Sequence, residues 1–393
     1  MTVSKKLPIS IGHDEPKTLI ISGNYAAAYA AKMARVEVVA AYPITPSTDC
    51  VEKLAEFVEE GKMGANYINV ESEHSVGAAL IGASATGART FSSTSAHGLL
   101  YMAEMVWWAA LARLPVVLSI VNRELAPAWS IWAQTQDSMS LRDSGIIQYY
   151  CKNAQEVYDT ILMAFRVSEH AHVYMPSLVC QDAYILSHTN APVEIPSQKE
   201  VDDFVGTYNP EHFVLDPKNP VTHSSLSYPE HYRQKRFNIM ESTHRAKQII
   251  KDVCAEFKEK FGRFHGDLID TYGIDKKTKH IIVSHSSIAE EIELSVDMLK
   301  KKGYDVGLIR LRVLRPYPDE EMREVCKNAE TIHFIERAPS YGFKGVIAID
   351  TMAALYEGKN HPKAFHHIEG LSGMDVTAEY AAGLVEEDLE TLK

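Results

Sequence analysis

The sequence predicts an α/β protein with two domains, a larger N-terminal domain and a smaller C-terminal domain. Apolar runs typical of buried strands alternate with helical patterns over residues 17–180, and this alternation resumes near residue 279. Repeated strand–helix units imply a mainly parallel sheet covered by helices on both faces, so we expect the first domain to be doubly wound. A chain of 393 residues is also long for a single core.

In the N-terminal region, each short apolar run is followed by a helical pattern. We expect strands at 17–22, 36–41, 66–70, 89–93, 115–121 and 176–180. We expect helices at 24–35, 48–60, 75–86, 95–113 and 154–170. Gly23 and Asn24 can cap the first helix, and Gly61 ends the second. Residues 123–145 show no periodicity, which predicts an irregular segment.

Prolines break the periodicity over residues 188–232, a stretch too long for an ordinary loop. We expect a wrapping connection or interface arm, held by apolar anchors at Val193, Ile195, Phe204, Val205, Phe213 and Leu215. A long amphipathic helix is predicted at 237–263. Farther on, we expect strands at 280–284, 305–313, 331–336 and 365–369, and helices at 288–302, 316–327 and 345–356. The resulting division is 1–187, 188–278 and 279–393.

Composition excludes several classes of function. The formal charge of −12 argues against a nucleic acid or an anionic membrane as partner. No apolar run approaches the length of a membrane span and no signal peptide opens the chain, so we expect a cytoplasmic protein. The five cysteines are far apart, and we expect no metal or iron–sulfur cluster on this chain. Phosphate-binding loops, dinucleotide fingerprints and nucleophile elbows are also missing from the sequence.

The turn at residues 42–47 follows a buried strand and precedes a helix. Pro43 and Pro46 fix φ and bias the residues before them away from the α region, so the chain turns sharply there. Such a turn presents Thr45 at the carboxyl end of a strand, where open α/β sheets place their ligands. The hydroxyl of Thr45 either satisfies turn or cap groups of the backbone or donates to an oxygen-rich substrate.

Glu73 lies between a strand and a helix of small residues, 77–87. It is either a carboxylate favoured by the helix dipole or a hydrogen-bond partner for the ring nitrogen of a flat cofactor, because glycine and alanine permit close approach. Glu71 lies two residues earlier on the expected strand end and would face the same way. The sequence therefore leaves the choice between the two open.

Arg123 directly follows the most β-branched strand of the region. It either forms a surface ion pair with Glu124 or Asp137, or binds a substrate carboxylate through its planar fork. The next segment is rich in aromatic and amide side chains, among them Trp129 and Trp132. This segment either lines or covers a pocket, or is a loop packed by its own tryptophans.

These motifs together resemble those of a known family. Residues 42–47, residues 71–73 with the small-residue helix, and Asn122-Arg123 followed by 136–138 and 142–145 resemble the α subunit of 2-oxoacid:ferredoxin oxidoreductases. Pyruvate:ferredoxin oxidoreductase is the best-known member of that family. The resemblance extends from about residue 20 through 182–189 and the proline-rich arm, and it resumes at 310–318.

The resemblance implies an N-terminal domain like the pyrimidine-binding domain of thiamine diphosphate enzymes and a C-terminal domain like that of transketolase. It makes Glu73 the catalytic residue that holds N1′ of the aminopyrimidine. Thr45 and Arg123 would bind the carboxylate and oxo oxygen of a 2-oxoacid. The substrate-binding turn would also include Pro43 and Ile44, and the expected pocket lining is Asn122, Trp129, Trp132 and Asp137.

A partner must supply what this chain lacks. Thiamine diphosphate enzymes carry a Gly-Asp-Gly motif for the diphosphate and Mg²⁺, and this sequence has none. The resemblance therefore implies a β subunit that shares the cofactor and carries Mg²⁺ and a 4Fe-4S cluster, together with a γ subunit and a ferredoxin-like δ subunit. Coenzyme A would take the acyl group, and ferredoxin or another acceptor would take the electrons. Alone, the chain would not be an enzyme.

The substrate tail is less defined than the head. Trp107, Trp108, Trp129 and Trp132 suit an aryl or branched tail as well as a small pocket. Overall similarity favours pyruvate, with phenylglyoxylate or a branched-chain 2-oxoacid as the alternative. No pair of basic residues suited to a second carboxylate is evident near the site, which ranks 2-oxoglutarate lower. A non-catalytic scaffold subunit of the same complex is the second alternative.

Overall fold

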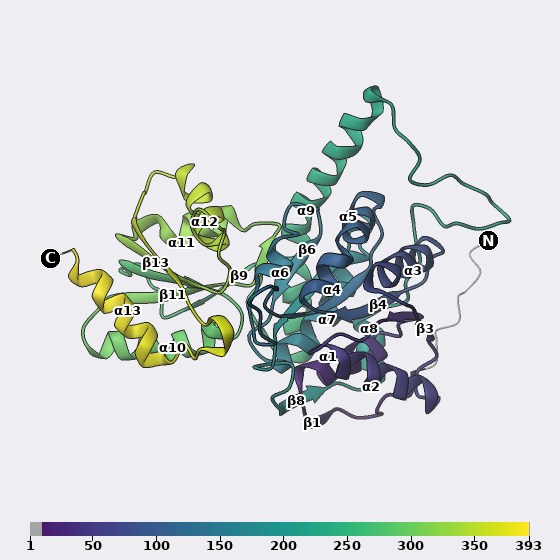
Figure 1. Cartoon of the computed structure of the whole chain (residues 1–393), viewed down its shortest axis with the longest axis horizontal. Helices are drawn as coiled ribbons and strands as arrows, with labels where there is room; N and C mark the ends of the chain where they lie inside the picture. The colour runs from purple at the N-terminus through teal and green to yellow at the C-terminus, as the bar shows by residue number, and fades with distance from the viewer. Residues whose placement is uncertain (1–9, 393) are drawn as a thin grey trace.

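A computed structural model of the chain describes residues 10–392. Figure 1 shows two lobes, with a seven-stranded sheet in the N-terminal lobe and a five-stranded sheet in the C-terminal lobe. The larger sheet contains β2 (Val38–Ala41), β3 (Asn66–Asn69), β4 (Thr90–Thr94), β5 (Val117–Asn122), β6 (Ile147–Tyr150), β7 (Ser177–Asp182) and β12 (Val313–Arg315). Its strand order is β12-β6-β7-β5-β4-β2-β3, and every pair is parallel except β12 with β6. The expected parallel α/β architecture is confirmed.

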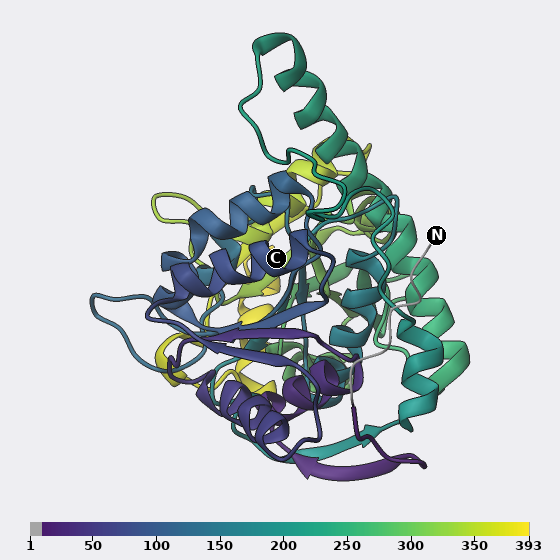
Figure 2. The same ribbon diagram turned by 90° about the vertical axis from the view of Figure 1, so that its right-hand side faces the viewer.

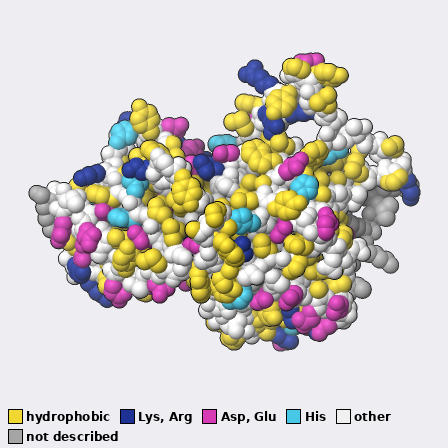
Figure 3. All heavy atoms as spheres, viewed as in Figure 1, with side chains coloured by type: hydrophobic (Ala, Val, Ile, Leu, Met, Phe, Trp, Pro, Cys, Tyr) yellow, Lys and Arg dark blue, Asp and Glu magenta, His cyan; other side chains and the backbone are white. Residues whose placement is uncertain are grey.

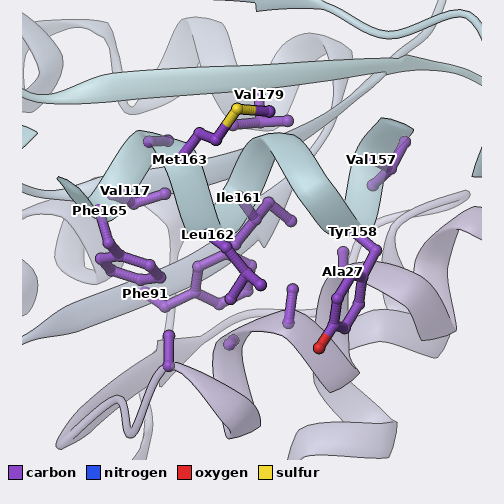
Figure 4. Packing of buried hydrophobic residues seen from close by; sticks show 14 of the residues in the cluster. Ala27, Phe91, Val117, Val157, Tyr158, Ile161, Leu162, Met163, Phe165 and Val179 are labelled. Atoms are coloured by element: carbon purple, nitrogen blue, oxygen red, sulfur yellow. The ribbon is translucent and has the colours of Figure 1, made fainter. Parts of the chain in front are cut away.

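Helices cover both faces of this sheet. One face packs against α1 (Gly23–Met33), α2 (Thr48–Glu59) and α7 (Ala154–Ser168). The other face packs against α3 (Glu73–Ala85), α4 (Ala96–Tyr101) and α5 (Ala103–Ala112). Figure 4 shows α7 packed on the sheet, with Phe165 beside Phe91 of β4 at a ring-centroid distance of 6.5 Å. Because both faces are covered, the central strands are buried along their whole length: all five residues of β4 and all six of β5 are buried.

Four local expectations for this lobe were wrong. The cap of α1 is Ser22, whose hydroxyl accepts a hydrogen bond from the amide of Tyr25, while Gly23 already lies in the helix. The helix expected at 95–113 is two helices that meet at Met102. β1 (Lys17–Ile21) lies outside the main sheet and pairs antiparallel with β8 (Ala191–Ile195). β6 was not expected, because four residues between loops give no measurable period.

The proline-rich segment combines a packed part and a projecting part. α8 (Gln198–Val205) begins with a capping box between Ser197 and Glu200 and buries Phe204 against the body. α9 (Pro229–Phe261) begins eight residues earlier than predicted, with its proline at the first helical position. Its first turns and the loop before them extend away from the lobe (Figures 1 and 2). Hydrophobic side chains gather on this projection (Figure 3), among them Tyr228 at 68% exposed.

The apolar anchors of that segment behave in two ways. Val193, Ile195, Phe204 and Val205 are buried, as expected. Phe213 packs only partly against the core, and Leu215 is 37% exposed. The segment stays attached to its own lobe beyond α8: Tyr208 is buried and its hydroxyl is 3.0 Å from that of Tyr174, and the amide of Leu215 donates a hydrogen bond to the carbonyl of Ala85 (2.9 Å).

The C-terminal lobe contains β9 (Ile269–Tyr272), β10 (His280–Ser284), β11 (Val306–Leu311), β13 (Thr331–Glu336) and β14 (Lys363–Ile368) in the order β14-β13-β10-β11-β9. Its helices are α10 (Ile288–Lys301), α11 (Asp319–Val325), α12 (Val346–Tyr356) and α13 (Ala378–Glu390). β14 is the expected edge strand, whereas β9 and α13 were not predicted. The strand expected at 305–313 ends at Leu311, and the chain then enters the other sheet as β12. The division at residues 187 and 278 stays a proposal. β9 lies before residue 278 but belongs to the sheet of the C-terminal lobe, and β12 lies after residue 278 but belongs to the sheet of the N-terminal lobe.

A buried ion-pair cluster joins the two lobes. Glu156 of α7, with no exposed surface, accepts hydrogen bonds from Arg310 (2.9 Å) and Arg312 (2.8 Å), each 1% exposed. Burial alone would raise the pKa of the Glu156 carboxyl, but the two arginines outweigh it and lower the pKa from 4.5 to about 2. The contact between the lobes therefore depends on an ionised Glu156.

Removing the charge of Glu156 should destabilise the fold. Glu156→Gln leaves two buried guanidinium groups without a carboxylate, which costs about 3–5 kcal/mol, measurable by urea unfolding. In the native chain the stabilisation is present above about pH 4.5 and is lost as pH falls toward 2, because the folded pKa lies below the unfolded one; the loss amounts to about 3 kcal/mol. Asp203→Asn, which breaks an exposed pair with Lys199, is the control and should leave stability nearly unchanged, because solvent screens exposed charges. Equal effects of the two variants would contradict this role.

Candidate active site

Four neighbouring strands bring the predicted site residues to one edge of the large sheet. The turn at 42–47 follows β2, Glu73 follows β3 and Arg123 follows β5, while α4 begins directly after β4. Because these strands are parallel and adjacent, their carboxyl ends lie together. The sequence-predicted residues therefore meet where such sheets bind ligands.

The proline turn is pinned from inside the protein. The buried side chain of Asn24 in α1 donates a hydrogen bond to the carbonyl of Pro46 (2.7 Å), and the hydroxyl of Ser47 donates to the carbonyl of Ile44 (2.8 Å). Thr45 and Pro43 are exposed, and Ile44 is half-buried. Within residues 10–392 the hydroxyl of Thr45 forms no hydrogen bond, so it does not serve the turn or the helix cap. It remains available to a ligand.

The structure separates Glu73 from Glu71. Ser72 caps α3 by accepting a hydrogen bond from the amide of Ser75 (3.3 Å), so Glu73 is the first residue of the helix and not part of a strand. Glu73 is 6% exposed, whereas Glu71 is exposed and accepts a hydrogen bond from the hydroxyl of Ser75. The expectation that the two side chains face the same way was wrong, because it assumed an extended backbone.

Glu73 faces Gly98, a residue that the sequence did not single out. A Cβ atom at Gly98 would lie 2.4 Å from Oε1 of Glu73 and 2.7 Å from Oγ1 of Thr94, so only glycine leaves room for this carboxylate. Within residues 10–392 the carboxylate of Glu73 forms no hydrogen bond or ion pair, although the residue as a whole is buried. The carboxylate oxygens are not among the fully buried atoms without a partner, so they keep some contact with solvent and can be reached by a ligand. The arrangement suits a polar ligand atom at Glu73.

The small residues of α3 serve packing as well as the site. A Cβ atom at Gly77 would lie 2.5 Å from Cβ of Met105, so this glycine lets α3 and α5 approach closely. Gly82, in contrast, faces open space. Part of the close approach expected at this helix is therefore made by another helix of the same chain, α5, and not by a ligand.

Arg123 contacts the proline turn directly. Its Nη1 atom donates a hydrogen bond to the carbonyl of Thr45 (2.5 Å), and its guanidinium lies 5.0 Å from the ring of Trp129. Burial is the main influence on its pKa and lowers it, while the charges of Asp137, Tyr184 and Glu73 act in the opposite direction. Nε of Arg123 is buried without a partner. The guanidinium therefore has capacity for an anion.

Asp137 fixes the ends of the elements around the site. Its carboxylate accepts hydrogen bonds from the side chain of Asn122 (2.7 Å) and from the amides of Ala96 (3.0 Å), Arg123 (3.1 Å) and Ser138 (2.8 Å). Burial raises the pKa of Asp137 to about 6, against the effect of these donors. Because Asn122 and Asp137 have no exposed surface, they position the strand ends instead of lining open space.

The tryptophans separate into two groups. Trp129 lies over Arg123, and Trp132 lies 5.0 Å from the ring of Tyr184, with exposures of 54% and 42%. Trp107 and Trp108 lie on α5 and line a groove of about 830 Å³ against the projecting part of α9. Only the first pair is therefore associated with the site.

The described part of the chain shows neither a metal-binding cluster nor a membrane-spanning helix. Among residues 10–392, no group of three or more histidine, cysteine, aspartate or glutamate side chains is arranged to hold a metal ion. In the same range no helix is both long and apolar enough to cross a bilayer.

Comparison with known proteins matches both lobes to one family. Residues 29–255 match the family model described as "Pyruvate flavodoxin/ferredoxin oxidoreductase, thiamine diP-bdg", and residues 278–381 match "Pyruvate:ferredoxin oxidoreductase core domain II". The chain is 43% identical to pyruvate synthase subunit PorA from Pyrococcus abyssi, over 95% of this chain and 95% of PorA. It is also 43% identical to ketoisovalerate oxidoreductase subunit VorA from the same organism, over 95% of this chain and 94% of VorA. It is 45% identical to PorA of Methanocaldococcus jannaschii, covering 91% of each chain.

Two solved structures share the fold. The 2-oxoglutarate:ferredoxin oxidoreductase from Magnetococcus marinus matches with a TM-score of 0.73 and 16% identity, covering 95% of this chain and 65% of that one, which is just under two thirds of its length. An inactive split-gene transketolase matches with a TM-score of 0.52 and 14% identity, covering 95% of this chain and 99% of that one. At these identities the likeness concerns the fold alone.

Filling the space at Gly98 should disturb Glu73. In Gly98→Ala the new methyl group displaces the Glu73 carboxylate, which overpacks the site and lowers the free energy of unfolding by about 1–3 kcal/mol. Gly82→Ala, at an open position in α3, is the matched control and should raise stability by about 0.5–1 kcal/mol. Thermal unfolding of both variants tests this. A Gly98→Ala variant as stable as the native chain would show that the carboxylate can move at no cost.

Proposed function

The chain belongs to the family of 2-oxoacid:ferredoxin oxidoreductase α subunits, and we propose that it forms half of a thiamine diphosphate site that decarboxylates and oxidises a 2-oxoacid. The observation that carries this proposal is Glu73, a residue 6% exposed whose carboxylate forms no hydrogen bond or ion pair within residues 10–392, beside Gly98 on the same sheet edge as Thr45 and Arg123. A carboxylate at that position suits a protonated or hydrogen-bonding ring nitrogen.

The residues present fit the pyrimidine half of the cofactor. Glu73 would hold N1′ of the aminopyrimidine, since its carboxylate has no partner in residues 10–392 and the space in front of it is kept open by Gly98. When bound, thiamine diphosphate supplies a nucleophilic carbon and an electron sink for decarboxylation. Glu73 contributes by sharing a proton with N1′, which controls the charge of the ring.

The turn and Arg123 would bind the head of the substrate. Arg123 is already oriented by its hydrogen bond to Thr45 and by Trp129, so little side-chain entropy is lost when its fork meets a carboxylate. The unpartnered hydroxyl of Thr45 would donate to the oxo oxygen, with Pro43 and Ile44 shaping the same turn. Fixing the carboxylate before it leaves as CO₂ is the positioning role expected of such a clamp.

Pyruvate is the proposed substrate, and ketoisovalerate is the second candidate. The equal identity to pyruvate synthase and ketoisovalerate oxidoreductase subunits favours these two over the aromatic phenylglyoxylate. A scaffold subunit without catalysis is disfavoured, because a scaffold has no need of an unpartnered Glu73 and a poised Arg123. Coenzyme A would accept the acyl group.

Partner subunits would complete the site. We propose a β subunit that binds the diphosphate with Mg²⁺ and carries a 4Fe-4S cluster, with γ and ferredoxin-like δ subunits and ferredoxin as acceptor. The projecting part of α9 is the proposed interface arm, since Arg233 and Arg236 form no ion pair within residues 10–392 and Phe237 is 52% exposed. Co-purification with this chain tests the subunit composition.

A substrate panel on the purified complex tests the function. Pyruvate, ketoisovalerate, phenylglyoxylate and 2-oxoglutarate should be compared by following the reduction of a low-potential acceptor with and without coenzyme A. We expect pyruvate to give the highest kcat/KM and turnover to require coenzyme A. No reduction with any of the four would refute the proposal, and a preference for ketoisovalerate would select the second candidate.

Glu73→Gln should abolish 2-oxoacid decarboxylation while the complex still assembles. The amide retains the size of the side chain but cannot share a proton with a ring nitrogen in the same way, so turnover should fall by about 10²–10⁴-fold. Glu71→Gln is the matched control, because Glu71 is exposed and bonded to Ser75. Near-normal turnover of Glu73→Gln would exclude the assigned role.

Arg123→Ala should weaken substrate binding more than it disturbs the fold. Loss of one charge-assisted hydrogen bond, worth about 1.5–3 kcal/mol, corresponds to a rise in KM of about 10- to 150-fold. Steady-state kinetics of the complex measures this effect, with Arg245→Ala, an exposed arginine on α9, as control. An unchanged dependence on 2-oxoacid concentration would count against the clamp.

A further inference from the structure

The loop at residues 124–135 leaves the sheet at the end of β5 and returns at α6 (Gln136–Met139). Asp137 secures the point of return and also accepts a hydrogen bond from the amide of Arg123, where the loop begins. Inside the loop, the amide of Glu124 donates to the carbonyl of Trp132 (3.2 Å). Since the middle of the loop is exposed, its position depends on contacts from other parts of the protein.

The C-terminal lobe supplies such contacts through residues 371–373. The amide of Ser372 donates a hydrogen bond to the carboxylate of Glu124. Gly373 lies against the indole of Trp132: a Cβ atom at this position would be 2.9 Å from Cγ, 3.0 Å from Cδ2 and 3.1 Å from Cδ1. Carbon atoms at their optimal separation are about 3.5–4.0 Å apart, so only glycine allows Trp132 to lie where it does.

Trp132 also contacts the N-terminal lobe. Its ring lies 5.0 Å from that of Tyr184, in the loop that follows β7. Its carbonyl accepts the hydrogen bond from the amide of Glu124, the residue after Arg123. Trp129, from the same loop as Trp132, lies 5.0 Å from the guanidinium of Arg123. Trp132 therefore links the C-terminal lobe to the loop whose Trp129 lies over the group that would bind the substrate carboxylate.

We propose that Gly373 is a positioning residue: by fixing Trp132 it holds the loop whose Trp129 lies over the substrate clamp, and thereby selects the side chain of the 2-oxoacid. The inference rests on the proposed function, which places the substrate carboxylate at Arg123. A methyl group at position 373 would displace the indole of Trp132 and with it the loop beside Arg123. The branched side chain of ketoisovalerate needs more room beside the clamp than the methyl group of pyruvate, so its turnover should be the more sensitive to this displacement.

Gly373→Ala in the assembled complex tests this inference against Gly342→Ala. Both glycines lie in the C-terminal lobe with positive φ, +77° and +85°, but a Cβ atom at Gly342 would meet nothing within 4 Å. Gly342→Ala therefore reproduces the backbone strain without the contact. We expect Gly373→Ala to lower the ratio of kcat/KM for ketoisovalerate over pyruvate about tenfold or more through KM, with kcat little changed. Gly342→Ala should leave the ratio as it is.

A second substitution distinguishes the contact between residue 373 and Trp132 from a general disturbance of the fold. Trp132→Ala removes the ring atoms Cγ, Cδ1 and Cδ2 that a methyl group at position 373 would meet, so Gly373→Ala/Trp132→Ala should show the selectivity of Trp132→Ala alone. A difference in tryptophan emission between the native and Trp132→Ala complexes reports the surroundings of Trp132, and this signal should shift in Gly373→Ala but not in Gly342→Ala. Identical behaviour of the two glycine variants, or a uniform loss of kcat without rescue, would overturn the inference. A native complex inactive on both 2-oxoacids would instead refute the proposed function itself.

Discussion

The buried carboxylate of Asp137 is the acceptor on which the candidate site depends. It binds the amide of Ala96, where α4 begins beside Gly98, and the amide of Arg123, where β5 ends. One carboxylate thus sets the position of the residue that makes room for Glu73 and of the residue that contacts Thr45. Because Asp137 has no exposed surface, loss of any of its donors would leave a buried charge unsatisfied.

A second buried carboxylate has a corresponding role between the lobes. Glu156 binds Arg310 and Arg312, and β12 continues directly from these arginines into the N-terminal sheet. The C-terminal lobe is therefore attached by backbone pairing and by buried charges, and its Gly373 can hold a loop of the other lobe in a defined place. A weakly attached domain could not set the position of Trp132.

Under the proposed function, this chain contributes half of a catalytic site. Glu73 would share a proton with a ring nitrogen, and Arg123 and Thr45 would orient the 2-oxoacid. The projecting start of α9 exposes apolar side chains such as Phe237, and its Arg233 and Arg236 form no ion pair within residues 10–392. This distribution is consistent with a subunit whose active site is completed by another chain.

The sequence by itself determined the parallel α/β lobe and the candidates Thr45, Glu73 and Arg123, because strand periodicity and the position after a strand are local properties. It could not distinguish Glu73 from Glu71, since that depends on where Ser72 starts the helix. Gly98 and Gly373 left no local signal either, because each is required by a side chain distant in the sequence. The crossing of β12 and the burial of Asp137 likewise arise from contacts between distant segments, which only the tertiary structure decides.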